Sequence, residues 1–185
     1  MALFTGRGDG GTTKLFDSPQ GVRVSKSSPL FEALGMLDEL NATTGWCAVG
    51  AGDLAVGERR ADDILREVQD HLFTLQAEVA GSPQRIPQAS VEAMGNLIGA
   101  IEALLPETTT FLILGDTERS ARFDMARTVA RRVERRLVTL AESGERDISA
   151  PACAYANRLS SLFYALARIA NKTEAAAERP PQYRV

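Results

Sequence analysis

Arginine side chains concentrate in one stretch of the sequence, where they could bind an anion. Residues 118–136 contain seven arginines and three acidic residues, although the whole chain carries a net charge of −3. Guanidinium groups pair bidentately with phosphate and carboxylate groups, so this stretch is a candidate site for an anionic ligand. The alternative is a solvated basic helix face with internal pairs such as Arg131–Glu134, and spacing alone favours this second interpretation.

Glycines crowd the segment from Thr5 to Thr13 too densely for a helix or a strand. Successive backbone N–H groups in such a segment can converge on an anion, and threonine hydroxyls can add donors, which would form a phosphate cradle. A Walker A loop is excluded, because two threonines follow the last glycine where Lys and Ser or Thr are required. The match to Gly6-x-Gly8-x-x-Gly11 lacks the strand and helix of a dinucleotide-binding fold. A flexible N-terminal arm is the alternative.

Ligands for a resident metal are scarce. Cys47 and Cys153 are the only cysteines and His71 is the only histidine. These residues are too few for a Cys/His zinc site or a disulfide framework. For His71 the pattern favours a structural or surface role over a catalytic one.

The chain of 185 residues has the length of one domain, and its 44% hydrophobic and 24% charged residues are typical of a globular protein. No apolar run has the length of a membrane span, and the N-terminus lacks the basic and apolar regions of a signal peptide. We therefore expect a cytoplasmic protein that binds no membrane. The acidic total argues against a general nucleic-acid-binding surface, although a helical nucleic-acid module using the arginine stretch is a third functional hypothesis.

Apolar periodicity and helix caps predict an all-α fold, a five-helix up-and-down bundle. Ser28 is the expected N-cap of the first helix, and Pro29 is its first residue. The division expected is a glycine-rich N-terminal loop over 1–27, the bundle over 28–171 and a loose tail over 172–185. The expected helices span about 29–50, 59–80, 88–105, 117–142 and 150–171.

The fourth expected helix has an apolar stripe with charged residues along its edge. Arg127, Arg131 and Glu134 each lie one residue beyond a stripe position, about 100° around the helix, with Arg135 beside them. An arginine at such an edge can be partly desolvated and still reach a bound anion. The stripe consists of Ala126, Ala130, Val133, Leu137 and Leu140.

Five blocks of sequence, in register over residues 4–171, resemble the PduO-type ATP:cob(I)alamin adenosyltransferases. The blocks are Thr5-x-x-Gly8-Asp9-x-Gly11-x-Thr13, Ser25-Lys26, Glu32-Ala33-Leu34-Gly35-x-x-Asp38-Glu39-Leu40-Asn41, Ala126-Arg127-x-x-x-Arg131-Arg132-x-Glu134-Arg135 and Asn157-Arg158-Leu159-Ser160. The resemblance implies a homotrimer of five-helix bundles that binds ATP between subunits and cobalamin in an adjoining pocket. Magnesium would accompany the triphosphate. A cobalamin reductase and an adenosylcobalamin-dependent enzyme are possible partners.

The resemblance also implies roles for individual residues. Phe111 would occupy the lower face of the corrin and displace its dimethylbenzimidazole, and Asp38 and Arg127 would form an ion pair between subunits. The implied nucleotide contacts are Thr5, Gly6, Arg7, Gly8, Asp9 and Thr13 in the loop, Lys26, and Arg131, Arg132, Glu134, Arg135 and Asn157 on the helices.

The sequence departs from the family pattern near the implied corrin pocket. Leu114-Gly115-Asp116 stands where Pro-Gly-Gly is usual, Asp124 stands where His is common, and Leu30 replaces a frequent Arg. Asp116 would place a charge beside the corrin. Leu114 and Asp116 motivate a second hypothesis, a trimeric carrier or regulator that binds ATP or cobalamin without efficient catalysis.

Overall fold

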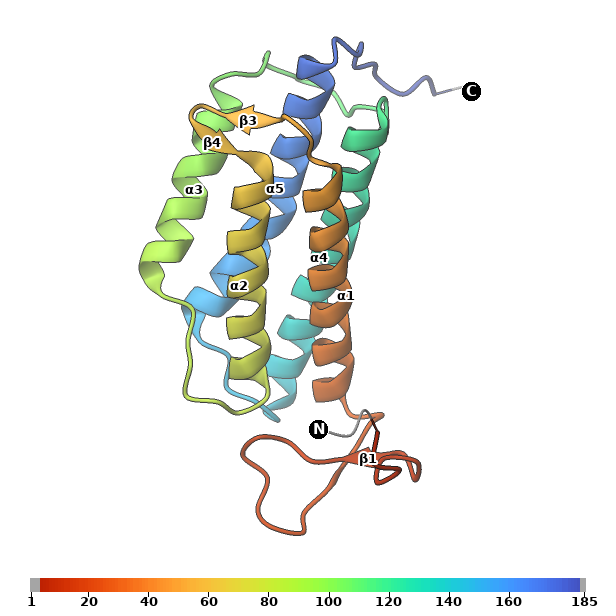
Figure 1. Cartoon of the computed structure of the whole chain (residues 1–185), viewed down its shortest axis with the longest axis vertical. Coiled ribbons are helices and arrows are strands. Elements are labelled where there is room, and N and C mark those ends of the chain that lie inside the picture. The colour runs from red at the N-terminus through yellow and green to blue at the C-terminus, as the bar shows by residue number, and fades with distance from the viewer. Residues whose placement is uncertain (1–3, 184–185) are drawn as a thin grey trace.

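The computed structural model of the chain describes residues 4–183, in which five helices run alternately up and down (Figure 1). The helices are α1 Pro29–Gly50, α2 Ala61–Val79, α3 Gln88–Glu102, α4 Glu118–Ser143 and α5 Ala150–Thr173. The predicted five-helix, all-helical fold is confirmed. Among the described residues, no helix is long and apolar enough to cross a membrane.

Buried aliphatic side chains join the helices into one core. Helix α4 packs against α1 and α5, α2 packs against α1, and α3 packs against α5. The expected stripe of α4 is buried throughout, from Ala126 to Leu140. Because that stripe faces the core, Arg127 and Glu134 are half-buried at its border and Arg131 and Arg135 project into solvent.

Local sequence signals mark the starts of three helices. Ser28 is at the expected N-cap position of α1 and Pro29 is its first residue, although the Ser28 side chain forms no cap hydrogen bond. Thr117 accepts a hydrogen bond from the Ser120 backbone N–H, while the Ser120 side chain accepts one from the Thr117 backbone N–H, which forms a capping box. The Ser149 side chain caps α5 in the same way, by accepting from the backbone N–H three residues later.

Two short strand pairs correct the sequence-based expectation. β1 (Thr12–Thr13) pairs antiparallel with β2 (Val24–Ser25), within the segment for which no strand was predicted. β3 (Ala55–Val56) pairs with β4 (Arg59–Arg60), so α2 begins at Ala61 rather than at Arg59. The two-residue loop of this hairpin contains Gly57 at φ 61°, a conformation that glycine adopts without strain. Pairs of two residues are too short to show alternation, and the prediction missed them for that reason.

The segment after α5 also differs from the predicted loose tail. Glu178 forms an ion pair with Arg168 of α5 at 2.9 Å. The Ile113 backbone N–H donates to the Arg179 carbonyl at 2.9 Å. The prediction is therefore wrong for residues 178–179, because long-range contacts hold them on the bundle. Residues 184–185 of the predicted tail and 1–3 of the predicted loop lie outside the described residues.

Candidate active site

A hollow of about 750 Å³ lies between α4, α5 and the connection that precedes α4; we call it the Phe111 hollow. Phe111 and Leu114 of the connection line it, together with Arg127 and Arg131 of α4 and Tyr164 of α5. The Phe111 side chain is 81% exposed, so its ring presents an apolar surface with little packing of its own. Asp116 does not line the hollow, and the expectation that its charge would lie beside the corrin stays a prediction.

A second hollow of about 460 Å³ adjoins the first along α4; we call it the Arg135 hollow. Arg131 lines both hollows, which places a cation at their junction. The Arg135 hollow gathers four of the residues expected to contact a nucleotide. These four are Arg131, Glu134, Arg135 and Asn157.

Two hydrogen bonds, one between α4 and α5 and one within α4, orient the side chains that line the Arg135 hollow. Asn157 Nδ2 of α5 donates to Glu134 Oε1 of α4 at 2.6 Å. Arg135 Nη1 donates to the Arg131 carbonyl at 3.1 Å. The alternative pair Arg131–Glu134 is not formed among the described residues, because Glu134 accepts from Asn157 instead. The guanidinium group of Arg131 is exposed and can approach a ligand from either hollow.

Two other arginines of α4 point toward α1. Arg132 pairs with Glu39 at 3.0 Å, and Arg136 pairs with Glu32 at 3.3 Å. Both pairs are about half exposed, and such pairs contribute little to stability because solvent screens them. Arg132 therefore lies outside both hollows in the single chain, unlike Arg131 and Arg135 of the same helix.

The glycine-rich segment folds on itself at the end of the bundle where α1 begins (Figure 1). Arg23 Nη2 donates to the Arg7 carbonyl at 2.7 Å, and Arg23 Nε donates to Thr12 Oγ1 at 2.9 Å. Lys26 Nζ donates to the Gly8 carbonyl at 3.0 Å. Arg23 escaped the sequence-based prediction because it lies outside the glycine cluster.

The expected loop residues do not meet the expected helical residues within one chain. Among the described residues, neither Lys26 nor any residue of 5–13 lines either hollow. Within one chain, the loop residues and the helical residues therefore form separate groups.

Asp124, a departure from the family pattern, connects α4 to the end of the Phe111-bearing connection. Its Oδ2 accepts from the Gly115 backbone N–H at 3.2 Å, and its Oδ1 lies 3.4 Å from Arg127 Nε. Burial raises the pKa of Asp124, and the Arg127 charge partly opposes that shift. Asp38 is exposed on α1, so the predicted intersubunit pair with Arg127 stays a prediction. Sequence spacing did not identify Asp124 as a residue that contacts both Gly115 of the connection and Arg127 of α4.

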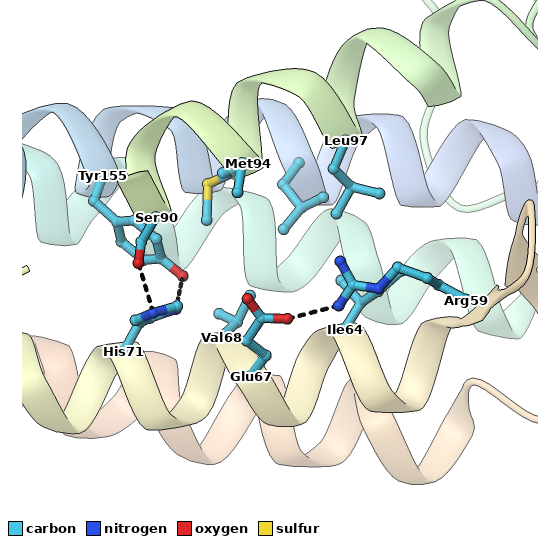
Figure 2. Close-up of a pocket in the computed structure, with 11 residues that line it drawn as sticks. Arg59, Ile64, Glu67, Val68, His71, Ser90, Met94, Leu97 and Tyr155 are labelled. Atoms are coloured by element: carbon cyan, nitrogen blue, oxygen red, sulfur yellow. Dashed lines mark hydrogen bonds and ion pairs between the residues drawn. The ribbon is translucent and has the colours of Figure 1, made fainter. Parts of the chain in front are cut away.

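His71 lies in a separate, partly buried network between α2, α3 and α5 (Figure 2). Its Nε2 is 3.0 Å from Ser90 Oγ, and its Nδ1 is 3.0 Å from Tyr155 Oη. The adjacent cavity measures about 20 Å³, room for about one water molecule. Burial raises the pKa of Tyr155, which keeps the phenol neutral. The contacts fit the structural role favoured for His71.

The fold and the two hollows define a helical-bundle protein in which an arginine-lined hollow adjoins a second hollow that contains an exposed phenylalanine ring. The sequence model of the family described as "Cobalamin adenosyltransferase" matches residues 3–170. The chain therefore belongs to the cobalamin adenosyltransferase family.

Named relatives agree with this family. The chain is 40% identical over 175 residues to the corrinoid adenosyltransferase PduO of Salmonella typhimurium, a match covering 91% of this chain and 49% of that protein. It is 34% identical over 178 residues to the corrinoid adenosyltransferase of Bacillus subtilis, covering 92% of this chain and 87% of that protein. The chain thus spans about half the length of the PduO relative.

Solved structures are similar over the whole bundle. A variant PduO-type ATP:corrinoid adenosyltransferase from Lactobacillus reuteri, complexed with cobalamin and ATP, superposes with a TM-score of 0.86 at 25% identity. The match covers 98% of this chain and 100% of that chain. A further variant of that enzyme, complexed with ATP, gives a TM-score of 0.84 at 26% identity, covering 97% of this chain and 100% of that one.

Proposed function

We propose that the protein transfers the 5′-deoxyadenosyl group of ATP to cob(I)alamin, forming adenosylcobalamin and releasing triphosphate. The observation that carries this proposal is the arrangement around Arg131, which lines both the hollow that contains the exposed Phe111 ring and the Arg135 hollow. A reaction between a corrin and a polyphosphate requires two adjoining sites of this kind. The family and its relatives' names support the same reaction.

The Arg135 hollow is the proposed ATP site. Arg131 and Arg135 would pair with the triphosphate, while Glu134 and Asn157 would contact the remainder of the nucleotide. The loop from Thr5 to Thr13 and Lys26 would come from a neighbouring subunit, because neither lines this hollow within its own chain. A homotrimer would bring these groups together.

Magnesium would accompany ATP rather than occupy a resident site. Among the described residues, no group of three or more His, Cys, Asp and Glu side chains is placed to hold a metal. Triphosphate oxygens themselves suit Mg²⁺, which usually retains several water ligands. The surrounding arginines would share the remaining negative charge.

The proposed reaction needs no protein nucleophile. The electron pair of Co(I) attacks the 5′-carbon of ATP, the Co–C bond forms, and the C5′–O bond breaks with its electron pair leaving on the triphosphate. The protein would align cobalt with the 5′-carbon and stabilise the departing charge. Phe111 would cover the lower face of the corrin and exclude dimethylbenzimidazole, which makes reduction to cob(I)alamin attainable.

A cobalamin reductase would supply the reduced substrate, and an adenosylcobalamin-dependent enzyme would accept the product. The proposed location is cytoplasmic.

The test is an anaerobic reaction of the purified protein with ATP, Mg²⁺ and chemically reduced cobalamin. We expect adenosylcobalamin and triphosphate in equal amounts, measured by absorbance and by ion chromatography. Tight binding of both substrates without product would instead identify the carrier or regulator. A salt-sensitive affinity for nucleic acid without ATP binding would identify the third hypothesis.

A further inference from the structure

The connection between α3 and α4, residues 103–117, carries Phe111 and is tied to the end of α5; we call it the Phe111 loop. Arg168 of α5 is only 9% exposed and lines the Phe111 hollow. Its Nη2 donates to the Pro106 carbonyl, on the α3 side of Phe111, at 3.0 Å. A buried guanidinium therefore holds the first part of the loop.

Glu178 completes the contact from the segment that follows α5. Its carboxylate accepts from Arg168 Nε at 3.1 and 3.2 Å and from Arg168 Nη2 at 2.9 Å. A guanidinium and carboxylate paired this way have a defined relative orientation. We call Arg168 and Glu178 together the clamp.

The residue after Glu178 holds the other side of the loop. The Arg179 carbonyl accepts from the Ile113 backbone N–H at 2.9 Å, two residues beyond Phe111. The loop backbone is thus fastened on both sides of Phe111 to the clamp or its neighbour, and Figure 1 shows the loop and this segment at the same end of the bundle.

Because Phe111 is exposed, the position of its ring depends on how the loop backbone is held. The ring is 81% exposed, so little side-chain packing fixes its position. Arg168 holds Pro106 directly, and Glu178 anchors the segment whose next carbonyl accepts from Ile113. Leaving one member of this buried ion pair unpaired is unfavourable, so losing either clamp residue would loosen the attachment of the loop. The ring would then sample positions away from the hollow.

We propose that Arg168 and Glu178 are positioning residues that hold Phe111 against the lower face of cobalamin. The inference rests on the proposed function and extends it to residues outside the nucleotide site. The clamp controls displacement of dimethylbenzimidazole from cob(II)alamin, whereas ATP binding and transfer from cob(I)alamin do not depend on it. Pre-reduced cob(I)alamin no longer needs its lower ligand displaced.

The principal test compares Glu178→Gln with the wild-type protein. The variant keeps the size of the side chain and removes its charge. With ATP saturating, electron paramagnetic resonance reports how much bound cob(II)alamin retains a coordinated dimethylbenzimidazole nitrogen. We expect the displaced fraction to fall about threefold or more, because small misplacements of a positioned group have large effects. Turnover from cob(II)alamin with a reductant falls in parallel, while KM for ATP and turnover from cob(I)alamin stay unchanged.

Arg168→Lys is the second variant, which keeps the positive charge and removes the forked contact with Glu178 and Pro106. We expect the same selective loss. Glu67→Gln is the control for loss of a paired carboxylate, because Glu67 of α2 pairs with Arg59 at 2.6 Å (Figure 2) and does not line the Phe111 hollow. We expect wild-type behaviour from the control.

Epistasis with Phe111 separates positioning from general destabilisation. In a Phe111→Ala background, Glu178→Gln should produce no additional loss of ligand displacement. The proposal is overturned if both clamp variants displace dimethylbenzimidazole as fully as the wild-type protein does. It is also overturned if Glu178→Gln lowers displacement as much in the Phe111→Ala background as it does with Phe111 present. Failure of the wild-type protein to make adenosylcobalamin from cob(I)alamin overturns the proposed function instead.

Discussion

Arg131 stands at the point where the two hollows meet, and its guanidinium is not used by an ion pair among the described residues. That combination suits a side chain that binds a ligand anion, because no internal partner has to be displaced. Arg132 and Arg136 of the same helix already pair with α1. Neighbouring arginines of one basic stretch therefore have different surroundings.

We predict that Arg131→Ala lowers kcat/KM for ATP about 10- to 100-fold, since a hydrogen bond to a charged group contributes about 1.5–3 kcal/mol. Steady-state adenosylation assays measure the loss. Arg136→Ala is the control, because it removes an exposed arginine of the same helix that lines neither hollow. Equal losses in the two variants would contradict the assignment.

Asp124 combines a buried carboxylate with contacts to the Phe111 loop and Arg127. Since burial raises its pKa in the folded protein, its contribution to stability is present at low pH and is lost as the pH rises through that pKa. Asp124→Asn removes the ionisation and can still accept from the Gly115 N–H. We therefore expect the free energy of unfolding of the variant to increase relative to wild type as the pH rises from about 4, the unperturbed value.

Urea unfolding of the two proteins at a series of pH values checks this expectation. A difference in unfolding free energy that is constant with pH would show that titration of Asp124 does not contribute. A decrease of the variant's relative stability with rising pH would contradict the direction.

At the scale of elements, helix bounds were largely predictable and short strands were not. Apolar spacing placed the start of α3 at Gln88, and Ser28-Pro29 placed the start of α1 at Pro29, where the structure has them. Proline favours the first position of a helix because its fixed φ suits the helix and its missing N–H is not needed there, so this signal lies in a few consecutive residues. The β1–β2 pair instead joins residues 12–13 to 24–25, and no local pattern records such a contact.

The capping box of α4 provides a test at this scale. Thr117→Ala removes the side chain that accepts from the Ser120 N–H, and we expect a loss of about 0.5–2 kcal/mol in the free energy of unfolding. Urea denaturation measures it. Thr128→Ala is the control within the same helix, where alanine favours the helix and no cap is lost. Comparable losses from both substitutions would exclude a specific effect of the cap.

At the scale of the whole molecule, the site residues divide into two groups that one chain does not bring together. The Arg135 hollow lies on α4 and α5, while the glycine-rich loop closes on itself through Arg23 and Lys26. Assembly into a trimer is the proposed solution. Asp38 on the exposed face of α1 is the predicted partner, across that interface, of Arg127.

We predict that Asp38→Asn and Arg127→Ala each lower activity and weaken the trimer, because each substitution removes the predicted ion pair between subunits. A double-mutant cycle should show a coupling energy above about 0.5 kcal/mol. Adenosylation assays and sedimentation measure the two effects. Additive losses, or a trimer indifferent to both substitutions, would exclude the pair.

The sequence by itself determined the five helices, the buried stripe of α4 and the family. Each of these depends on residue types at local spacings, and a 3.6-residue period identifies a buried face before its packing partner is known. The edge positions of Arg127, Arg131 and Glu134 follow from that period.

Only the tertiary structure decided which partners these residues have. It pairs Glu134 with Asn157, Arg132 with Glu39 and Arg168 with Glu178, and it places Asp116 outside the Phe111 hollow. Such contacts depend on which helices pack together and on how far each side chain reaches across the interface. Residues 178–179 show the difference most clearly, because a polar segment near Pro180-Pro181 looks unstructured until Arg168 and Ile113 supply the charge and the backbone donor that hold it.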